Sequence, residues 1–275
     1  MNRQLIVEGY LSDLGIKGFD LTSSEGQVEF LNKLQAAHIA RHSFNSLAVV
    51  IGNELPLDLT SLYEKIVVKR RGGYCFEHNK LIFNVLEQLG FDVKLALARV
   101  VYNRDVDSPR THRVTLVRIN GVDYVVDGGF GHLGARLPVR LEHGVEQPQG
   151  KESFRIVIKE SGEHCYQVLK DGDYFTLYTF DLGVYTESDC LVGHFFSHRH
   201  PTAAFVNNLV VSRKPEDSIY SLRNGEFHWI IADGTTVTRL TTALELHEKL
   251  TQVFELDVDV AISEFLFNKF VQDNS

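Results

Sequence analysis

The sequence contains little cysteine and no pattern in which its cysteines would pair. Cys75, Cys165 and Cys190 are the three cysteines among 275 residues, and none of them stands in a Cys-x-x-Cys motif. An odd count without that spacing argues against a disulfide framework and against a cysteine zinc site. Unpaired cysteines are typical of the reducing cytoplasm, where we expect this protein to work.

Positive charge and long apolar runs are scarce as well. The 28 lysines and arginines against 36 aspartates and glutamates give a formal net charge of −8, so the chain has no basic field to attract nucleic acid or anionic lipid. No apolar run approaches the roughly 18 residues of a membrane span. Glu8 interrupts the N-terminal segment before a signal-peptide core forms. We expect no nucleic-acid or membrane partner, and an anionic ligand would need a local basic pocket.

The spacing of apolar residues changes near Gly90. Helical spacing predominates before it, as in Val28, Phe30, Leu31 and Leu34. Alternation beyond it predicts a barrel or a strongly curved sheet. The expected strands are 93–102, 111–119, 122–127, 154–159, 165–169, 174–178, 207–212, 227–232 and 235–240, followed by closing helices at 242–253 and 260–271. Two or three domains are expected, with boundaries near residues 90 and 193 that depend only on the change of period.

One segment combines two glycines, a cysteine and the start of an apolar series: Arg70-Arg71-Gly72-Gly73-Tyr74-Cys75-Phe76-Glu77-His78-Asn79. The series continues to Leu89 and closes before Gly90, which predicts a turn that leads into a helix. Cys75 then lies at or beside the helix N-terminus, where unpaired N–H groups and the helix dipole favour a thiolate. We therefore expect a lowered pKa and a nucleophilic sulfur at Cys75. An inert buried cysteine is the alternative.

A β-hairpin is predicted downstream of this helix. Residues 111–119 alternate between apolar and polar side chains, Asn120-Gly121 is a strong signal of a two-residue turn, and residues 122–127 resume a strand. A turn of two residues determines the register of both strands. Pairing outward from the turn sets Val114 opposite Asp127.

His112 lies two positions beyond Val114, so it shares a face with Asp127 and is diagonal to it. Diagonal neighbours are about 7–8 Å apart at the backbone, within reach for an imidazole and a carboxylate. A carboxylate that binds one ring nitrogen orients the ring and leaves the other nitrogen to accept a proton from a thiol. Cys75, His112 and Asp127 are therefore the candidate nucleophile, base and orienting acid. An ordinary exposed cross-strand pair is the alternative, and a longer loop would change the register.

Three separate motifs resemble the arylamine N-acetyltransferase family. They are the segment from Arg71 to Asn79, the His112 hairpin that ends in Asp127-Gly-Gly-Phe-Gly131, and the segment from Pro201 through Phe205 to Val210. The motifs keep their order and family spacing over nearly the whole chain. The resemblance implies an α+β fold of an N-terminal helical bundle, a central β-barrel and a C-terminal α/β lid, which we place at residues 1–90, 91–193 and 194–275. It also implies a cysteine-protease-like Cys-His-Asp triad between the first two parts.

The resemblance further implies an activity. Acetyl-coenzyme A (acetyl-CoA) acetylates Cys75, coenzyme A (CoA) leaves, and an arylamine, an arylhydrazine or an N-hydroxyarylamine takes the acetyl group. Passage through a covalent thioester divides one transfer into two easier displacements. Acetyl-CoA is thus expected as a co-substrate, no metal is implied, and we expect a monomer or a weak homo-oligomer.

Other residues receive roles only through this resemblance. Five align with apolar positions that line the family's amine pocket, with core packing as the alternative: Phe44, Phe76, Val100, Phe130 and Phe205. Three are expected to bind the coenzyme: Gly129 and Gly131 would admit its thioester arm, and Arg104 would meet its phosphates, although a solvated surface arginine is the alternative.

The chain departs from the family where Asn45 follows Phe44. The resemblance implies a glutamate there, which holds the arginine before the two glycines. Either Arg71 finds another partner, with Glu77 and Glu64 as candidates, or the site is remodelled. His194, His198 and His200 have a spacing that a metal could use, yet they lack a nearby cysteine or paired carboxylate motif. We do not interpret them as a metal site.

Two other functions stay open at this point. The same triad would serve a different reaction, either amide synthesis from a larger acyl thioester or hydrolysis as in proteases and transglutaminases. The chain would also fit a binding protein that keeps the fold without catalysis. Acetylation of Cys75 by acetyl-CoA in the absence of amine distinguishes the acetyltransferase from both alternatives.

Overall fold

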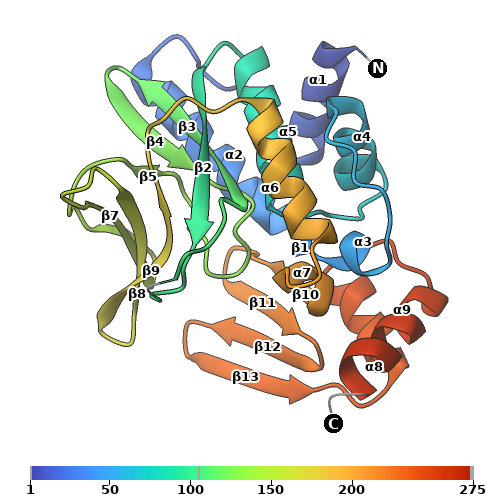
Figure 1. Ribbon diagram of the computed structural model, residues 1–275. Coiled ribbons are helices and arrows are strands. Elements are labelled where there is room, and N and C mark those ends of the chain that lie inside the picture. The colour runs from blue at the N-terminus through green and yellow to red at the C-terminus, as the bar shows by residue number, and fades with distance from the viewer. Residues whose placement is uncertain (1, 105, 273–275) are drawn as a thin grey trace.

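The computed structural model describes residues 2–104 and 106–272. Their helices and strands follow the predicted order, with a helical part first, a barrel second, and a smaller sheet with closing helices last (Figure 1). None of the described helices has both the length and the apolar character needed to cross a membrane.

The first part is helical. Its elements are α1 (Arg3–Asp13), α2 (Ser24–Arg41), α3 (Leu47–Val50), α4 (Leu59–Tyr63) with the π-helical turn η1 (Glu64–Val68), and α5 (Cys75–Gln88). The Ser23 hydroxyl caps α2 by accepting the N–H of Gly26. Buried side chains of α1, α2, α4 and α5 form one core, in which Leu34 and Ile82 are fully buried.

The second part is a nearly closed barrel of eight strands. They are β2 (Asp92–Val100), β3 (His112–Ile119), β4 (Val122–Val126), β5 (Val139–Arg140), β6 (Gln147–Gln149), β7 (Glu152–Ile158), β8 (His164–Lys170) and β9 (Asp173–Phe180). Neighbouring strands pair in the order β5-β4-β3-β2-β9-β8-β7-β6. A bridge between His143 and Ile156 draws the two ends of this order together.

The third part is an antiparallel sheet covered by helices. It contains α6 (Glu187–Arg199), α7 (Ala204–Asn207), β10 (Val210–Arg213), β11 (Ser218–Arg223), β12 (Glu226–Ile231), β13 (Gly234–Arg239), α8 (Ala243–Glu248) with η2 (Lys249–Val253), and α9 (Val260–Phe267) with η3 (Asn268–Gln272). The short strand β1 (Phe44–Asn45) pairs with β10 and joins this sheet to the helical part. The boundary predicted near Gly193 falls inside α6, where Gly193 packs closely against Phe76 of α5.

The hairpin register confirms the prediction. Ile119 pairs with Val122 and Thr115 with Val126, so the same register places Val114 opposite Asp127. Asn120 and Gly121 both have positive φ, of 48° and 80°, as this type of two-residue turn requires.

Helix α5 is held between the helical part and this hairpin. Its residues Leu81 and Val85 share a core with Val117 of β3 and Val126 of β4. Burial of this stripe fixes the helix against the barrel wall, and the N-terminal end of α5 therefore lies beside the start of β3. This packing brings Cys75 toward His112 across a sequence separation that no local signal spans.

Candidate active site

A tight turn delivers Cys75 to the first position of α5. Gly72 has a φ of 57°, and a Cβ at this residue would lie 2.1 Å from the carbonyl oxygen of Ser43, so only glycine fits. At the end of the turn, Glu77 Oε2 accepts the backbone N–H of Tyr74 at 3.2 Å. The carboxylate of Glu77 is 1% exposed and its other oxygen accepts Lys65 Nζ at 2.5 Å. A buried ion pair therefore holds the cap of the helix that carries Cys75.

Replacing Lys65 with methionine is expected to lower the free energy of unfolding by about 2–3 kcal/mol, because it leaves the buried Glu77 carboxylate without its cation. Urea denaturation followed by circular dichroism measures the change. Arg140→Met is the matched control, since it removes one side of an exposed ion pair with Glu142 and should cost at most about 1 kcal/mol. Equal costs for the two variants would contradict this account of the cap.

Cys75 is buried, with 3% of its surface exposed. Its Sγ donates to the carbonyl oxygen of Thr111 at 3.5 Å, one residue before His112. Burial first, and the charge of Asp127 second, raise the pKa of the Cys75 thiol, while the backbone N–H groups of Phe76 and Arg113 act in the opposite direction. The sequence-based expectation of a lowered pKa is wrong, because loss of water outweighs the helix N-terminus at this depth.

His112 and Asp127 form a buried pair. Nε2 of His112 lies 2.7 Å from Oδ2 of Asp127, and the two side chains are 2% and 3% exposed. Burial by itself would raise the pKa of Asp127, but the charge of His112 and hydrogen bonds from His112, Asn79 and Gly129 lower it below its usual value. Asp127 therefore stays ionised in a dry site and fixes the ring of His112 through Nε2. This close pair excludes the alternative of an exposed cross-strand contact.

Asn79 connects the parts of this site, a role that sequence reasoning did not assign. Its Nδ2 donates to Oδ1 of Asp127 at 2.8 Å and to the carbonyl oxygen of Arg113 at 2.5 Å. Its Oδ1 accepts the N–H of Gly128 at 3.0 Å. The available signal was its position four residues after Cys75, which puts both side chains on one face of the helix.

Cys75 and His112 open into one cavity of about 320 Å³. Of the residues predicted from the family, seven line this cavity: Phe44, Val100, Phe130, Phe205, Arg104, Gly129 and Gly131. Phe76 is not in this lining and packs instead against the rings of Tyr74 and His194. The volume lies at the lower end of the roughly 300–1,000 Å³ of small-molecule sites.

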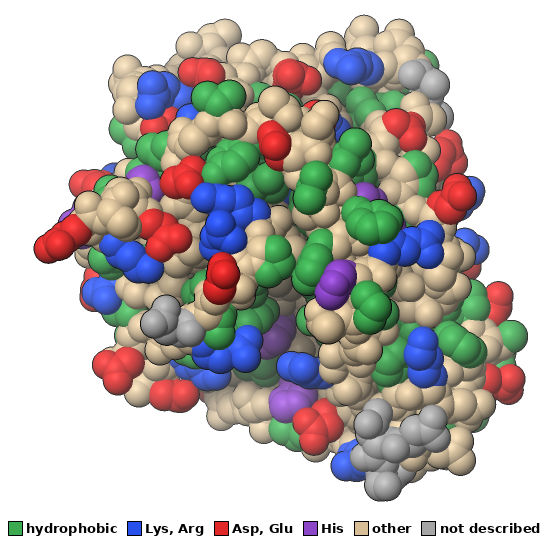
Figure 2. Space-filling view, in the orientation of Figure 1, with side chains coloured by type: hydrophobic (Ala, Val, Ile, Leu, Met, Phe, Trp, Pro, Cys, Tyr) green, Lys and Arg blue, Asp and Glu red, His purple; other side chains and the backbone are tan. Residues whose placement is uncertain are grey.

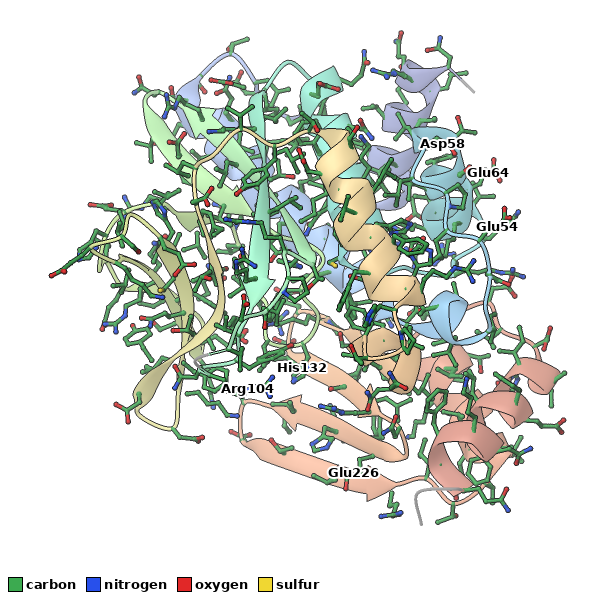
Figure 3. The ribbon with its side chains drawn as sticks, in the orientation of Figure 1. Glu54, Asp58, Glu64, Arg104, His132 and Glu226 are labelled. Carbon is green, nitrogen blue, oxygen red and sulfur yellow. The ribbon has the colours of Figure 1, made fainter. Side chains whose placement is uncertain are left out.

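The mouth of the cavity is basic, although the chain as a whole is acidic. Arg104 and Arg223 line it, and no aspartate or glutamate of the described residues does. His132 lines it too, but burial lowers the pKa of His132 to about 4, so its ring adds no charge near neutral pH. Figure 3 places the labelled Arg104 and His132 together, between the barrel and the lid strands. In the space-filling view, lysine, arginine and histidine side chains gather around the hollow on this face (Figure 2). This arrangement supplies the local basic pocket that an anionic ligand needs in this acidic chain.

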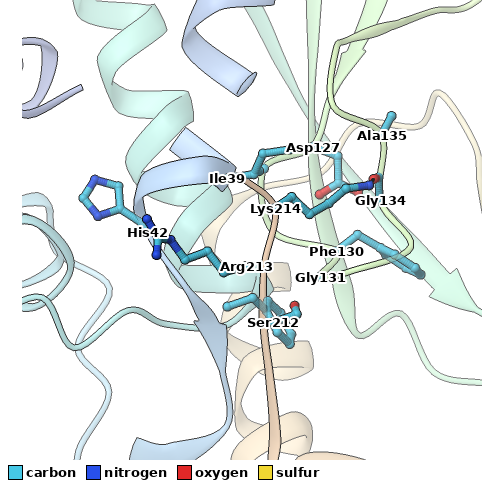
Figure 4. Close-up of a pocket in the computed structure, with 12 residues that line it drawn as sticks. Ile39, His42, Asp127, Phe130, Gly131, Gly134, Ala135, Ser212, Arg213 and Lys214 are labelled. Atoms are coloured by element: carbon cyan, nitrogen blue, oxygen red, sulfur yellow. Dashed lines mark hydrogen bonds between the residues drawn. The ribbon is translucent and has the colours of Figure 1, made fainter. Parts of the chain in front are cut away.

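A buried lysine ties the lid to the loop after Asp127. Lys214 is 2% exposed, and its Nζ donates to the carbonyl oxygen of Gly134 at 2.5 Å and to both carboxylate oxygens of Glu152 at 2.9 Å. Burial lowers the pKa of Lys214 to about 8. Figure 4 shows Lys214, Gly134 and Asp127 around a small cavity behind the site. The lid is thereby anchored to the same loop that carries Gly129 and Phe130.

Comparison with known proteins gives the family. A family model described as N-acetyltransferase matches residues 27–263. An arylamine N-acetyltransferase of Mycolicibacterium smegmatis is 32% identical over 256 residues, which cover 91% of each chain. The chain belongs to the arylamine N-acetyltransferase family. A Salmonella typhimurium relative, named arylamine N-acetyltransferase / N-hydroxyarylamine O-acetyltransferase, is 35% identical over 73% of this chain and 72% of its own.

A solved member of the arylamine N-acetyltransferase family has the same fold. The Mycobacterium marinum protein in complex with CoA superposes with a TM-score of 0.89, at 29% identity, over 96% of this chain and 99% of its own. The helical part, the nearly closed barrel and the lid are therefore features that this chain shares with the family.

Asn45 stands at the position where the resemblance implied a glutamate. Asn45 donates from Nδ2 to the carbonyl oxygen of Arg71 at 3.0 Å, so it holds the backbone and not the guanidinium. Nε of Arg71 lies 4.0 Å from Asp257, and both side chains are more than half exposed. Of the two expectations for Arg71, the structure agrees with a remodelled site and not with Glu77 as the partner, because Glu77 is committed to Lys65 and the cap of α5.

The histidines of α6 make contacts within the protein. His194 contacts the hydroxyl of Tyr74 through Nδ1 and the carbonyl oxygen of Leu55 through Nε2, and His198 reaches the carbonyl oxygen of His194. No group of three metal-binding side chains is found in residues 2–104 and 106–272.

Buried histidines behind Cys75 predict a loss of stability in acid. Burial lowers the pKa of His78 from its usual 6.5 to about 3 and shifts His38 in the same direction. Between these values the unfolded chain binds protons that the native state does not. Each such group makes stability fall by up to about 1.4 kcal/mol per pH unit as the pH decreases from about 6.5.

Urea denaturation at pH 7.5, 6.5, 5.5 and 4.5 is expected to give stability that is full above about pH 6.5 and falls steadily below it. The His78→Gln variant is the control, because it should show a shallower slope. A constant free energy of unfolding from pH 7.5 to 5 would contradict the buried neutral histidines.

Proposed function

We propose that this protein transfers an acetyl group from acetyl-CoA to an arylamine, an arylhydrazine or an N-hydroxyarylamine through a thioester on Cys75. In the first step the Cys75 sulfur forms a bond to the acetyl carbonyl carbon, the bond to the CoA sulfur breaks, and the CoA sulfur takes the proton. In the second step the acceptor nitrogen or oxygen attacks the acyl-enzyme, and Cys75 leaves as a thiol. The supporting observation is that Cys75 and His112 line one cavity and that buried Asp127 pairs with His112.

The proton of Cys75 passes to His112 in this proposal. Nε2 of His112 is occupied by Asp127, so Nδ1 is the nitrogen that accepts. Since burial raises the pKa of Cys75, a free thiolate is disfavoured until the proton has a place inside the site. The ionised Asp127 stabilises the imidazolium that forms, and the same proton is available to the departing CoA thiolate.

Aromatic side chains of the cavity suit a flat acceptor. Phe130 lies edge-on to the ring of His112 at 5.1 Å between centroids, and Phe44 and Phe205 meet edge to face at 5.7 Å. An aromatic ring inserted between these walls would bury its apolar surface and present its amine toward Cys75. The Salmonella typhimurium relative named for both N- and O-acetyl transfer supports the wider acceptor range.

Glycines and arginines that line the cavity would allow CoA to bind there. A Cβ at Gly129 would lie 2.9 Å from the Cα of Cys75, and Gly131 has a φ of 93°, so the backbone approaches the nucleophile without side chains in the way. Arg104 and Arg223 line the opening where a phosphate-bearing arm would leave the site. The CoA complex of the Mycobacterium marinum relative is consistent with this assignment.

Substitution of Arg223 by alanine is expected to raise the KM for acetyl-CoA about fivefold with little change in kcat, because a partly exposed phosphate contact contributes about 1 kcal/mol. A short acetyl thioester that lacks phosphates should show no such change. Arg118→Ala on the far hairpin, where Arg118 pairs with Asp123, is the control variant. An equal rise of KM for both donors would contradict a phosphate role.

Intact-mass spectrometry after mixing with acetyl-CoA, without any amine, tests the proposed function. A mass gain of one acetyl group per chain that is lost on addition of an arylamine, and that is absent in Cys75→Ala, is the expected result. Absence of this adduct together with turnover of longer acyl thioesters or peptides would overturn the proposal in favour of another acyl-transfer or hydrolytic reaction.

We further propose that the enzyme works in the cytoplasm as a monomer or a weak homo-oligomer. All three cysteines are unpaired, which suits a reducing compartment. Sedimentation at several protein concentrations measures the oligomeric state.

A further inference from the structure

A chain of three buried side chains runs from α1 to the turn before Cys75. The hydroxyl of Tyr10 lies 2.6 Å from Nδ1 of His38, and Nε2 of His38 lies 2.7 Å from Nδ1 of His78. Nε2 of His78 then reaches the carbonyl oxygens of Gly73 at 3.1 Å and Ser43 at 3.3 Å. Tyr10, His38 and His78 are each fully buried, and none of them lines the catalytic cavity.

The two carbonyl oxygens that His78 contacts determine the direction of every hydrogen bond among these three side chains. Two carbonyl oxygens only accept, so Nε2 of His78 must carry the proton and donate. Burial keeps the pKa of His78 and His38 below the usual value, so both rings are neutral and Nδ1 of His78 is an acceptor. His38 therefore donates from Nε2 and accepts at Nδ1, and Tyr10 donates its hydroxyl proton. Only one set of tautomers satisfies all of these contacts.

Titratable groups lie next to Tyr10, His38 and His78 without taking part in the hydrogen bonds that connect these three side chains. His42 and Asp13 lie on its Tyr10 side, with His42 stacked on the Tyr10 ring and its Nε2 3.2 Å from Asp13. Lys65 faces His78 from η1, where Glu77 holds it. Burial lowers the pKa of His42, so its ring is neutral near neutral pH. The ions nearby have charged partners of their own, since Asp13 pairs with Arg41 and Arg70, and Lys65 pairs with Glu77.

The turn before Cys75 and the loop after Asp127 both contact these three buried side chains. The carbonyl oxygen of Gly73, which accepts from His78, also accepts the N–H of Asn45 at 2.6 Å and lies two residues before Cys75. On the other side, a Cβ at Gly128 would lie 2.9 Å from the His38 ring, directly after Asp127. The turn that presents the nucleophile and the loop that follows the acid thus rest on the same pair of rings.

We propose that His78, oriented by His38 and Tyr10, is a positioning residue that holds the Gly73 carbonyl and thereby sets the place of the Cys75 sulfur relative to His112. The inference deepens the proposed acetyl transfer, because it concerns the reactivity of the same cysteine. The positioning role needs one donor, Nε2 of His78, directed at the carbonyl oxygens. The acceptor at Nδ1 serves only to orient the ring. A misplacement of about 1 Å of a reacting group can cost on the order of 100-fold in rate.

Two substitutions separate the donor from the acceptor. In His78→Gln the terminal amide nitrogen can take the place of Nε2 and donate to Gly73. In His78→Asn the shorter side chain offers an oxygen near the place of Nδ1, toward His38, and cannot reach Gly73. His164→Asn is the matched control, since His164 is a buried histidine of strand β8 that stacks on Phe180, outside the chain.

The rate of Cys75 alkylation by iodoacetamide between pH 6 and 9 is the first measurement, because it requires no acetyl transfer. At equal foldedness by circular dichroism, we expect His78→Asn to react at least about tenfold more slowly than His78→Gln, with His164→Asn close to the unmodified protein. The rate of CoA release in the first half-reaction should follow the same order. A failed acetyl-transfer assay would overturn the proposed function alone, whereas the alkylation comparison would still judge the positioning role.

Nitrogen NMR of the labelled, unmodified protein is the second measurement. Protons on Nε2 of both His38 and His78 at neutral pH are the expected result. A proton on Nδ1 of either ring, a charged ring, or equal alkylation rates for His78→Asn and His78→Gln, whether both are normal or both are slow, would overturn the positioning role.

Discussion

Replacing Cys75 with alanine is expected to abolish acetyl transfer, with a loss of about 10⁴-fold or more in kcat/KM. The sulfur is the atom that would carry the acetyl group, and no other described nucleophile lies at the cavity with a partner like His112. Removing one buried sulfur from the apolar cluster around Phe76 and Leu95 costs stability of only about 1–2 kcal/mol. Steady-state transfer from acetyl-CoA to an arylamine and intact mass of the acyl-enzyme measure the loss.

Cys165→Ala is the matched control for this experiment. Cys165 is 5% exposed and lies on strand β8 of the barrel, where burial also raises its thiol pKa. It should keep full activity and a single acetylation site. Appreciable turnover by the Cys75 variant, or loss of the adduct in the Cys165 variant, would show that the reaction does not pass through the helix cysteine.

The acid and base of this site could be paired from the sequence because their link is local. Asn120-Gly121 commits the chain to a turn of two residues, and a turn of known length leaves one register, so the shared face of His112 and Asp127 follows by counting. The helix after Cys75 was equally accessible, since its apolar stripe and Gly90 mark both ends. These signals are contained in fewer than about 20 consecutive residues, within the reach of turn and helix rules.

The surroundings of Cys75 could not be predicted from the sequence in the same way. The pKa of its thiol depends on how much water the barrel and α6 exclude, and burial arises from contacts between segments far apart in sequence. Strands β1 and β10 pair Phe44 with Ser212, but no turn connects them directly, so no local sequence signal predicts this pair. The contacts of Asn45 and Arg71 depend on the same long-range packing, so the sequence could not decide between a new glutamate partner and a remodelled site.

Asn79 illustrates why sequence patterns can miss the role of a residue in the site. In the sequence, Asn79 stands out only as the last residue of the segment that carries Cys75, although it holds Asp127, Gly128 and Arg113 together. An amide that donates and accepts at once is useful only where its partners converge, and their convergence is a property of the folded chain. Its helical position opposite the hairpin becomes informative once the hairpin has been placed.

Substituting Asp127 with asparagine is expected to lower kcat/KM by about 10⁴-fold while the fold persists, because it changes the tautomer of His112. Oδ1 of Asp127 accepts from Asn79 and from the N–H of Gly129, so the asparagine must turn its oxygen toward these donors. Its NH₂ group then faces Nε2 of His112. The ring responds by moving its proton to Nδ1, and the nitrogen that should accept the cysteine proton becomes a donor.

The pH profile distinguishes this effect from simple loss of structure. Cys75 alkylation in the Asp127→Asn variant should be slow near neutral pH and become faster as the pH rises, since hydroxide can then remove the proton that His112 no longer accepts. Asp123→Asn is the matched control, because Asp123 pairs with Arg118 at the exposed end of the same hairpin and should leave the profile unchanged. An alkylation profile of the Asp127 variant that matches the unmodified protein would mean that the carboxylate does not control the imidazole, and that Cys75 gains its reactivity from the backbone N–H groups around it.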